Sequence, residues 1–157
     1  NINIVAKTYH GDEGQKAFLY ENRIPILTAI VTRESILNVN CFREENKGGT
    51  EDYELWLNLL ANNHIIRGTD LKLSLYRIHS NSTTATNNMD INVIKMFSRF
   101  FTEYPNLKSK YKKQIVYWLS KILNQATNKN ELSQVFNKEV LNFIYINTNR
   151  IFFWYYI

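Results

Sequence analysis

The sequence predicts an α/β fold followed by a helical tail. Three stretches have the apolar alternation or the continuous apolar character of strands, and these are residues 2–6, 26–32 and 71–79. Residues 50–60 repeat apolar side chains with the period of a helix, and from Asp90 onward only this helical period is found. We therefore expect a mixed sheet with helices in residues 1–89 and an all-helical tail in residues 90–157.

Length and composition are those of a folded globular protein. The chain has 157 residues, of which 45% are hydrophobic and 14% aromatic, enough to bury a sizeable core. The single cysteine, Cys41, excludes an internal disulfide and suits a reducing compartment. No stretch is long and apolar enough to span a bilayer, and no signal peptide opens the chain, so we expect a cytoplasmic protein. Because the chain begins at Asn1 without an initiator Met, we expect it to be a piece of something longer.

The elements before the central helix are predicted from turn residues and apolar runs. Residues 10–14 are turn material, followed by a short segment that ends at Tyr20. The run at residues 26–32 is nearly all apolar, as expected of a strand buried on both faces. A short helix is predicted from Ile36 to Val39, before a polar loop over residues 43–49.

The stretch from Thr50 to Leu60 is the predicted helix around which the first part of the chain is organised. It follows Gly48-Gly49, carries acidic residues in its first turn, where the helix dipole favours negative charge, and is expected to end near Asn62. At about 100° per residue, the sequence divides into an apolar face, Tyr53, Trp56, Leu57, Leu59 and Leu60, and a face expected to point to solvent, Glu51, Glu54, Asn58 and Asn62.

Asp52 is the exception in this helix, because it falls on the apolar side near Trp56 and Leu59. An unpaired buried charge is costly, so an acid aimed inward needs a partner. Either Asp52 is a structural acid hydrogen-bonded to the preceding glycine loop, or it faces a cleft and does chemistry. The spacing alone favours the structural interpretation and leaves the other open.

Beyond the helix, Ile65-Ile66 is a short strand candidate and residues 71–79 are a stronger one. The alternation of the longer stretch places on one side Leu71, Leu73, Leu75, Arg77 and His79. Two polar groups therefore continue an apolar stripe at the strand's C-terminal end, the usual place for ligand contacts in open α/β sheets. A lone histidine at a strand end is more often a surface or hydrogen-bonded residue.

Residues 90–157 are predicted to form a basic, aromatic-rich helical tail. The first helix carries the apolar stripe Ile91, Ile94, Phe97, Phe101 and Tyr104 and is expected to stop at Pro105. A second helix is predicted over residues 108–124, and shorter ones over residues 130–136 and 138–145. Residues 1–89 carry 9 Lys/Arg and 10 Asp/Glu, whereas residues 90–157 carry 10 and 4, so the tail is the basic surface. Either its lysines are solvated on packed helices, or they dock on an anionic membrane surface, with nucleic acid the weaker alternative.

Most motifs for nucleophilic, phosphate or zinc chemistry are missing from the sequence. The glycines lack the spacing of a phosphate-binding loop, and no serine sits in a nucleophile elbow. The cysteine and the three histidines do not have the spacing of zinc ligands. Acid or base chemistry by a carboxylate is therefore the better candidate.

Four stretches occur in the order found in one enzyme family. They are residues 24–37, residues 39–44, Glu51-Asp52-Tyr53-Glu54-Leu55-Trp56-Leu57, and Leu73-Ser74-Leu75-Tyr76-Arg77-Ile78-His79-Ser80-Asn81-Ser82. The third resembles the Glu-Asp-Tyr/Trp-Asp-Leu-Trp-Leu helix of family-2 inverting glycosyltransferases, and the fourth their Leu-x-x-Tyr-Arg-x-His-x-x-Ser strand and loop. The resemblance covers residues 24–84 and implies the C-terminal, acceptor-side half of a GT-A (Rossmann-like) domain.

The resemblance also implies a role for each site residue. Asp52, the second acid of the helix motif, would be the general base that deprotonates the acceptor hydroxyl, which then attacks the anomeric carbon with inversion. Glu51 and Trp56 would contact acceptor or donor. Arg77 would face the donor diphosphate, onto which its guanidinium can fork, and His79 would complete a divalent-metal shell.

The implied ligands are a nucleotide-sugar donor, Mg or Mn, and a saccharide or lipid-linked acceptor used in polysaccharide or cell-envelope synthesis, with peripheral contact at the inner face of the membrane. Two departures from the family's pattern matter. Asn40-Cys41 replaces its glycine pair, and there is no opening strand-helix-strand unit with an Asp-x-Asp pair. We therefore expect no transfer unless the donor-binding half is supplied. The rival interpretation is a non-catalytic binding module that uses the basic tail to hold a membrane or nucleic acid.

Overall fold

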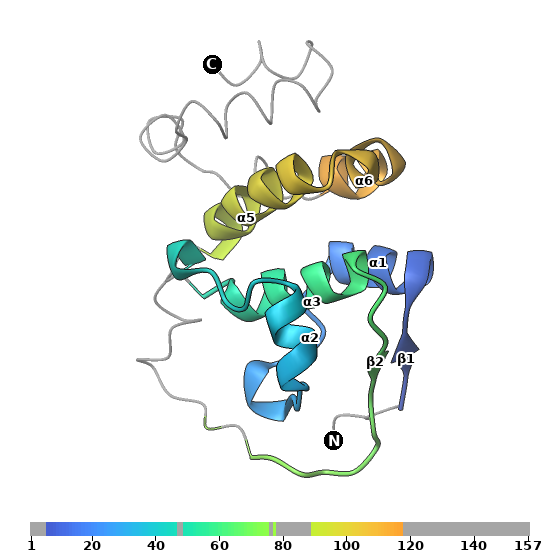
Figure 1. The fold of residues 1–157 in the computed structure, drawn as a ribbon, viewed down its shortest axis with the longest axis vertical. Helices are drawn as coiled ribbons and strands as arrows, with labels where there is room; N and C mark the ends of the chain where they lie inside the picture. The colour runs from blue at the N-terminus through green and yellow to red at the C-terminus, as the bar shows by residue number, and fades with distance from the viewer. Residues whose placement is uncertain (1–5, 47–48, 76, 78–88, 118–157) are drawn as a thin grey trace. The chain divides into compact units, whose positions relative to one another are not determined.

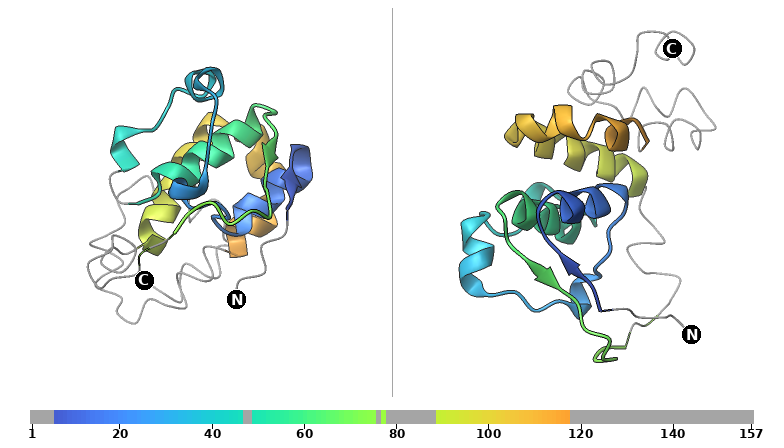
Figure 2. Two further views of the ribbon diagram at one scale, coloured as in Figure 1. Left: turned by 90° about the horizontal axis from the view of Figure 1, so that it is seen from below. Right: turned by 90° about the vertical axis from the view of Figure 1, so that its right-hand side faces the viewer.

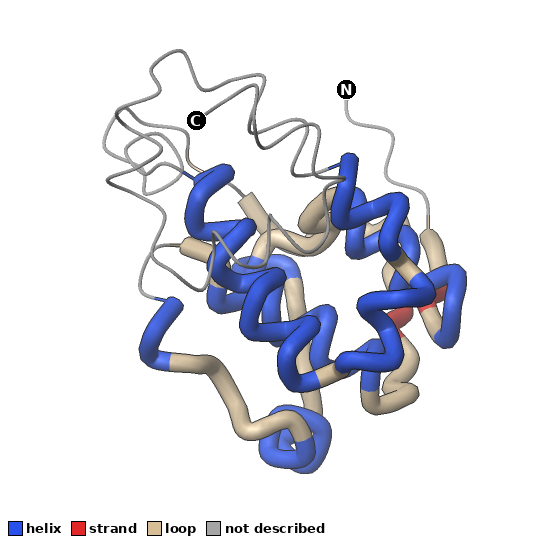
Figure 3. The backbone as a smooth tube through the Cα atoms, turned by 90° about the horizontal axis from the view of Figure 1, so that it is seen from above, coloured by secondary structure: helices blue, strands red, loops and turns tan. Residues whose placement is uncertain are grey.

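A computed structural model describes residues 6–46, 49–75, 77 and 89–117. The chain divides into two compact units, residues 1–87 and 88–157. Figure 3 shows that the described backbone is mostly helical, with its strands confined to one small sheet. A mixed α/β fold is compatible with this content.

The first unit is organised around one helix, as the sequence predicts. Its elements are β1 (Thr8–Tyr9), α1 (Gly11–Tyr20), the 3₁₀ helix η1 (Ile26–Thr28), α2 (Arg33–Asn38), the 3₁₀ helix η2 (Glu44–Asn46), α3 (Glu51–Ala61) and β2 (Ile66–Arg67). Helix α3 packs against both α1 and α2 (Figure 1). The predicted bounds of α3 are confirmed, because its apolar residues repeat with the helical period through Leu60.

The sheet is a two-stranded antiparallel ribbon. Thr8 lies opposite Arg67 and Tyr9 opposite Ile66, and the N–H of Gly68 donates to the carbonyl of Lys7 at 2.7 Å. Figure 2 shows the two strands side by side, β1 leading into α1 and β2 following α3. The ribbon therefore ties the start of α1 to the end of α3.

Helices α1 and α3 approach closely because Gly14 has no side chain. A Cβ at this position would lie 3.0 Å from Cδ2 of Leu60 and 3.1 Å from the carbonyl carbon of Tyr9. Next to it, Nε2 of Gln15 donates to the carbonyl of Leu60 at 3.1 Å, which satisfies one of the last carbonyls of α3. The buried apolar residues of the two helices are Phe18, Leu19, Tyr53, Leu55, Trp56, Leu57, Leu59 and Leu60.

The second unit begins with the amphipathic helix that the sequence predicts. Helix α5 (Met89–Glu103) buries Ile94, Phe97 and Phe101, three members of the predicted stripe. Pro105 then opens α6 (Pro105–Lys110), where the missing N–H of a proline costs nothing. A turn at Tyr111 separates α6 from the helical residues 112–117, so the predicted second helix is broken into two pieces where the structure describes it. The other predicted helices of the tail lie outside the described residues.

The longer predicted strands are wrong wherever the structure describes them. Residues 26–28 form η1, and the side chain of Ile30 is 101% exposed. Residues 71–75 and 77 are not in a strand, and Leu75 is 98% exposed. A strand needs a neighbour for its backbone hydrogen bonds, and in the described ranges β1 and β2 pair only with each other. The rest of residues 71–79, and residues 2–5, lie outside the description.

Two local boundaries also differ from the prediction. The expected turn at residues 10–14 is wrong, because α1 begins at Gly11 with Asp12 and Glu13 in the first turn, where the helix dipole favours them. Helix α2 begins at Arg33 and not at Ile36, because the hydroxyl of Thr32 accepts the Ser35 N–H at 3.2 Å and caps the helix there. Within the ranges given above, no helix is long and apolar enough to cross a membrane.

Candidate functional site

Asp52 lies in the first turn of α3 with its carboxylate half-buried. Its Oδ1 accepts two hydrogen bonds, from the backbone N–H of Tyr53 at 2.7 Å and from Nδ2 of Asn22 at 3.2 Å. The side chain of Thr50, the residue before the helix, makes no capping hydrogen bond. The sequence placed Asp52 on the inner side of the helix. The partners observed here are the Tyr53 N–H and Asn22, which follows α1.

Burial raises the pKa of the Asp52 carboxyl above its ordinary value of 3.8, and the negative charge of Glu51 adds to the rise. The hydrogen bonds from Tyr53, Asn22 and the backbone of Ile26 oppose this rise, since they favour the ionised form. Desolvation is the larger effect. A carboxylate with a raised pKa is a stronger base once it is ionised, which suits proton abstraction.

Asn22 is held by its own loop so that its amide group reaches Asp52. The Oδ1 of Asn22 accepts the backbone N–H of Ile24 at 3.3 Å, while Nδ2 donates to Asp52. The carbonyl of Ile24 in turn accepts the indole N–H of Trp56 at 3.0 Å. Asp52 and Trp56 of α3 therefore contact the loop at Asn22 and Ile24, the residues on either side of Arg23.

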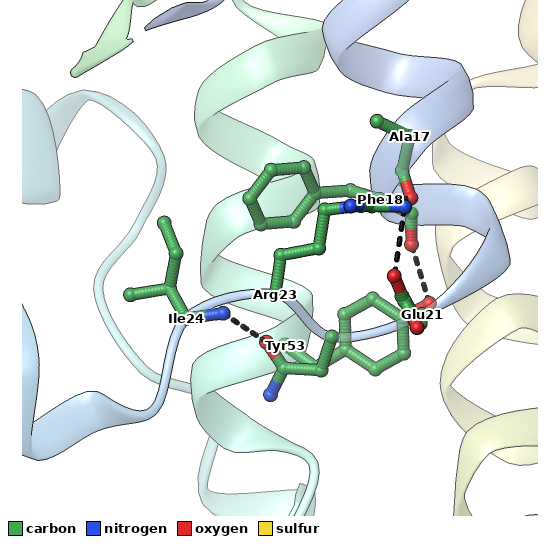
Figure 4. A network of polar contacts seen from close by, with 7 residues as sticks. Ala17, Phe18, Glu21, Arg23, Ile24 and Tyr53 are labelled. Carbon is green, nitrogen blue, oxygen red and sulfur yellow. Dashed lines mark hydrogen bonds and ion pairs between the residues drawn. The ribbon is translucent and has the colours of Figure 1, made fainter. Parts of the chain in front are cut away.

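Arg23 fastens the same loop to α1 (Figure 4). Its Nε donates to the carbonyl of Ala17 at 3.0 Å, and its Nη2 lies 2.7 Å from Oε1 of Glu21. Nearby, the hydroxyl of Tyr53 donates to the carbonyl of Phe18. These contacts join α1, the loop and α3 into one support for the Asp52 carboxylate.

Trp56 and Glu51 lie on the same helix as Asp52, with different surroundings. The Trp56 side chain is only 2% exposed, so its observed role is packing and support of the loop. Glu51 is half-buried, and its Oε2 has no hydrogen-bond partner where the structure is described. Their expected contacts with acceptor or donor stay predictions.

Of Arg77 and His79, the structure describes only Arg77. Arg77 is exposed, and no hydrogen bond or ion pair between it and Asp52 is found in the described part of the chain. His79 lies outside that part. Their expected roles at the diphosphate and the metal stay predictions.

An ion pair on the far side of α3, between a buried acid and a partly exposed arginine, was not predicted from the sequence. Glu54 is 1% exposed, and its Oε1 lies 3.6 Å from Nε of Arg43, in the loop before η2. Asn58, one turn later, is 2% exposed. The prediction that Glu54 and Asn58 point to solvent is therefore wrong, because this side of α3 is enclosed as well. The one sign of this ion pair in the sequence is Arg43, a basic residue in the polar loop that precedes α3.

A metal site is not formed by the residues described. No three side chains of His, Cys, Asp or Glu gather there into a group that could hold an ion. The divalent metal that the resemblance implies was expected to need His79 and a donor-binding half, and it stays a prediction.

No protein-family model, no curated protein and no solved structure matches this chain. The functional interpretation therefore depends on the geometry around Asp52 and on the sequence motifs that surround it.

Proposed function

We propose that this chain is the acceptor-side part of an inverting glycosyltransferase of the family-2 type, with Asp52 as its general base. The observation that supports this most is the setting of Asp52, a half-buried carboxylate in the first turn of α3 held by Tyr53 and Asn22. The motif of residues 51–57 supplies the role of that acid by resemblance.

In the proposed reaction, the Asp52 carboxylate accepts the proton of an acceptor hydroxyl that lies within hydrogen-bond distance. The hydroxyl oxygen attacks the anomeric carbon of the donor sugar, and the bond from that carbon to the nucleoside diphosphate breaks on the opposite face. The new glycosidic bond therefore has inverted configuration. The raised pKa of Asp52 makes the proton transfer more favourable, and the loop contacts through Asn22 fix the carboxylate in place.

The proposal includes a donor, a divalent metal and an acceptor. The nucleotide-sugar donor and Mg or Mn are assigned to a donor-binding half that carries an Asp-x-Asp pair, with Arg77 and His79 facing the diphosphate or metal. The acceptor is a saccharide or a lipid-linked glycan of a surface polysaccharide, and the reaction takes place in the cytoplasm. A GT-A domain completed in this way is the proposed fold.

The test is Asp52→Asn in a transferase that contains a donor-binding half. Losing a positioned general base lowers turnover by roughly 10²- to 10⁴-fold, whereas Asp70→Asn, which alters an exposed acid, should leave transfer unchanged. Circular dichroism of both variants checks that the fold is kept. Turnover close to wild type in Asp52→Asn would remove the base assignment.

A second candidate function, a non-catalytic binding module, is favoured by one separate observation. The helical residues 112–117 of the second unit expose lysines beside apolar side chains. If the chain supplied with a donor-binding half shows no transfer while these lysines are needed for binding, the module becomes the leading interpretation.

A further inference from the structure

One face of the helical segment 112–117 combines positive charge with exposed apolar surface. It consists of Lys112, Lys113, Val116 and Tyr117, and we call it the lysine face. Val116 is 36% exposed and Tyr117 is 49% exposed. Two exposed lysines and two exposed apolar side chains therefore lie together on this face.

The packing of the segment fixes which way this face points. At about 100° per residue, the four residues of the lysine face fall on one side of the helix, while Tyr111, Gln114 and Ile115 fall on the other. Tyr111 is 0% exposed and Ile115 is 1% exposed. Because these two side chains anchor the segment, the lysine face is held outward.

The segment that carries the lysine face contains no acidic residue that could neutralise its lysines. Residues 104–117 contain four lysines, Lys108, Lys110, Lys112 and Lys113, and neither Asp nor Glu. Lys112 and Lys113 are exposed, and neither makes an ion pair in the described part of the chain. The segment therefore attracts a negatively charged surface.

We propose that the lysine face docks on an anionic membrane surface. The two lysines contact the anionic headgroups, and Val116 and Tyr117 enter the interfacial layer, where tyrosine side chains are favoured. This inference does not depend on the proposed transferase activity, because it uses only residues of the second unit.

The mixture of side chains favours lipid over nucleic acid. Arginine, whose forked guanidinium suits bidentate contacts with guanine, is one of the main base-reading side chains of nucleic-acid surfaces, and residues 104–117 contain none. An exposed valine gains nothing from a phosphate backbone, whereas it gains from burial at the boundary of headgroups and acyl chains.

The test uses the full chain and sedimentation with lipid vesicles. We expect binding to phosphatidylcholine vesicles that contain phosphatidylserine and none to pure phosphatidylcholine vesicles. Binding should weaken as salt rises, because salt screens exposed charges. Soluble glycerophosphoserine should not displace the protein, since a membrane surface, and not a single headgroup pocket, is the proposed partner.

Two sets of variants locate the contact. Each lysine near an anionic surface contributes roughly fivefold to the affinity, so Lys112→Gln/Lys113→Gln should lower vesicle binding by about 25-fold. The control, Lys7→Gln/Lys16→Gln, removes the same charge from exposed lysines of the first unit and should leave binding unchanged. Tyr117→Ser should lower binding without changing its salt dependence.

Four results would overturn the proposal. They are no binding to anionic vesicles, an equal loss in the control variant, full displacement by glycerophosphoserine, and binding to an oligonucleotide that needs Lys112 and Lys113 when vesicle binding does not. The last result would assign the lysine face to nucleic acid. Circular dichroism of each variant verifies that helicity is kept.

Discussion

The substitution Tyr53→Phe tests the contact that joins α3 to the end of α1. Tyr53 is 3% exposed, and its hydroxyl donates to the carbonyl of Phe18. Phe18 lies in the last turn of α1, where carbonyls lack an intrahelical donor. Burial raises the pKa of the Tyr53 phenol far above its ordinary value, so the hydroxyl stays protonated and keeps donating.

The expected cost follows from the carbonyl that the substitution leaves behind. A buried acceptor without a donor loses about 1–3 kcal/mol, and we expect the free energy of unfolding to fall by about 2 kcal/mol. For a chain of this length, this corresponds to a fall in Tm of about 4–8 °C. Urea unfolding followed by circular dichroism measures the change.

Tyr9→Phe is the matched control, because it removes the same oxygen from another tyrosine of the first unit. The Tyr9 ring packs edge-on against Phe18 at 5.1 Å between centroids, and its hydroxyl has no hydrogen-bond partner among the residues described. Its loss should stay within about 0.5 kcal/mol. Equal losses in the two variants would show that the Tyr53 hydroxyl does not hold α1 to α3.

Two further predictions concern the acids of α3. Because burial raises the pKa of Asp52 above 3.8 in the folded state, its contribution to stability is present in acid and is lost as pH rises through the folded-state value. Asp52→Asn removes the titrating group and so avoids this loss. Urea unfolding at several pH values should therefore show that the free energy of unfolding of the variant, relative to that of wild type, rises from acid to neutral pH. If this relative free energy falls toward neutral pH instead, the ionised Asp52 carboxylate stabilises the fold and is a structural acid. Arg43→Gln should lower the free energy of unfolding by about 1–2 kcal/mol, because the buried Glu54 carboxylate loses a nearby positive charge whose side chain is itself partly exposed. Arg43→Gln/Glu54→Gln should recover part of that loss, and an additive double variant would contradict the pairing.

The predictions that are confirmed share a local physical cause. Helices α3 and α5 follow from the repeat of apolar residues every three to four positions, a pattern that packing on one side imposes. The same spacing rule did not sort the acids of α3, because Asp52, expected on the inner side, is half-buried like Glu51, whereas Glu54, expected to face solvent, is buried. The strands could not be predicted from local spacing, because a stretch of alternating residues becomes a strand only when a neighbouring strand pairs with its backbone hydrogen-bonding groups.

The candidate site was only half predictable. The motif around Asp52 indicated the acid, but Asn22, its hydrogen-bond partner, is thirty positions away in the sequence. Nothing in the residues near Asn22 distinguishes it from an ordinary loop amide. Its role appears only because Arg23 and Trp56 fasten the loop between α1 and α3.

The sequence by itself determined the central helix, the amphipathic helix of the second unit and the uneven distribution of charge. All of these depend on spacings within a few turns of chain. The tertiary structure decided which polar residues are buried and what they contact, as Glu54 with Arg43 and Asp52 with Asn22 show. Helical periodicity identifies the most apolar side of α3, but only the packing of distant segments determines whether its other side also leaves water.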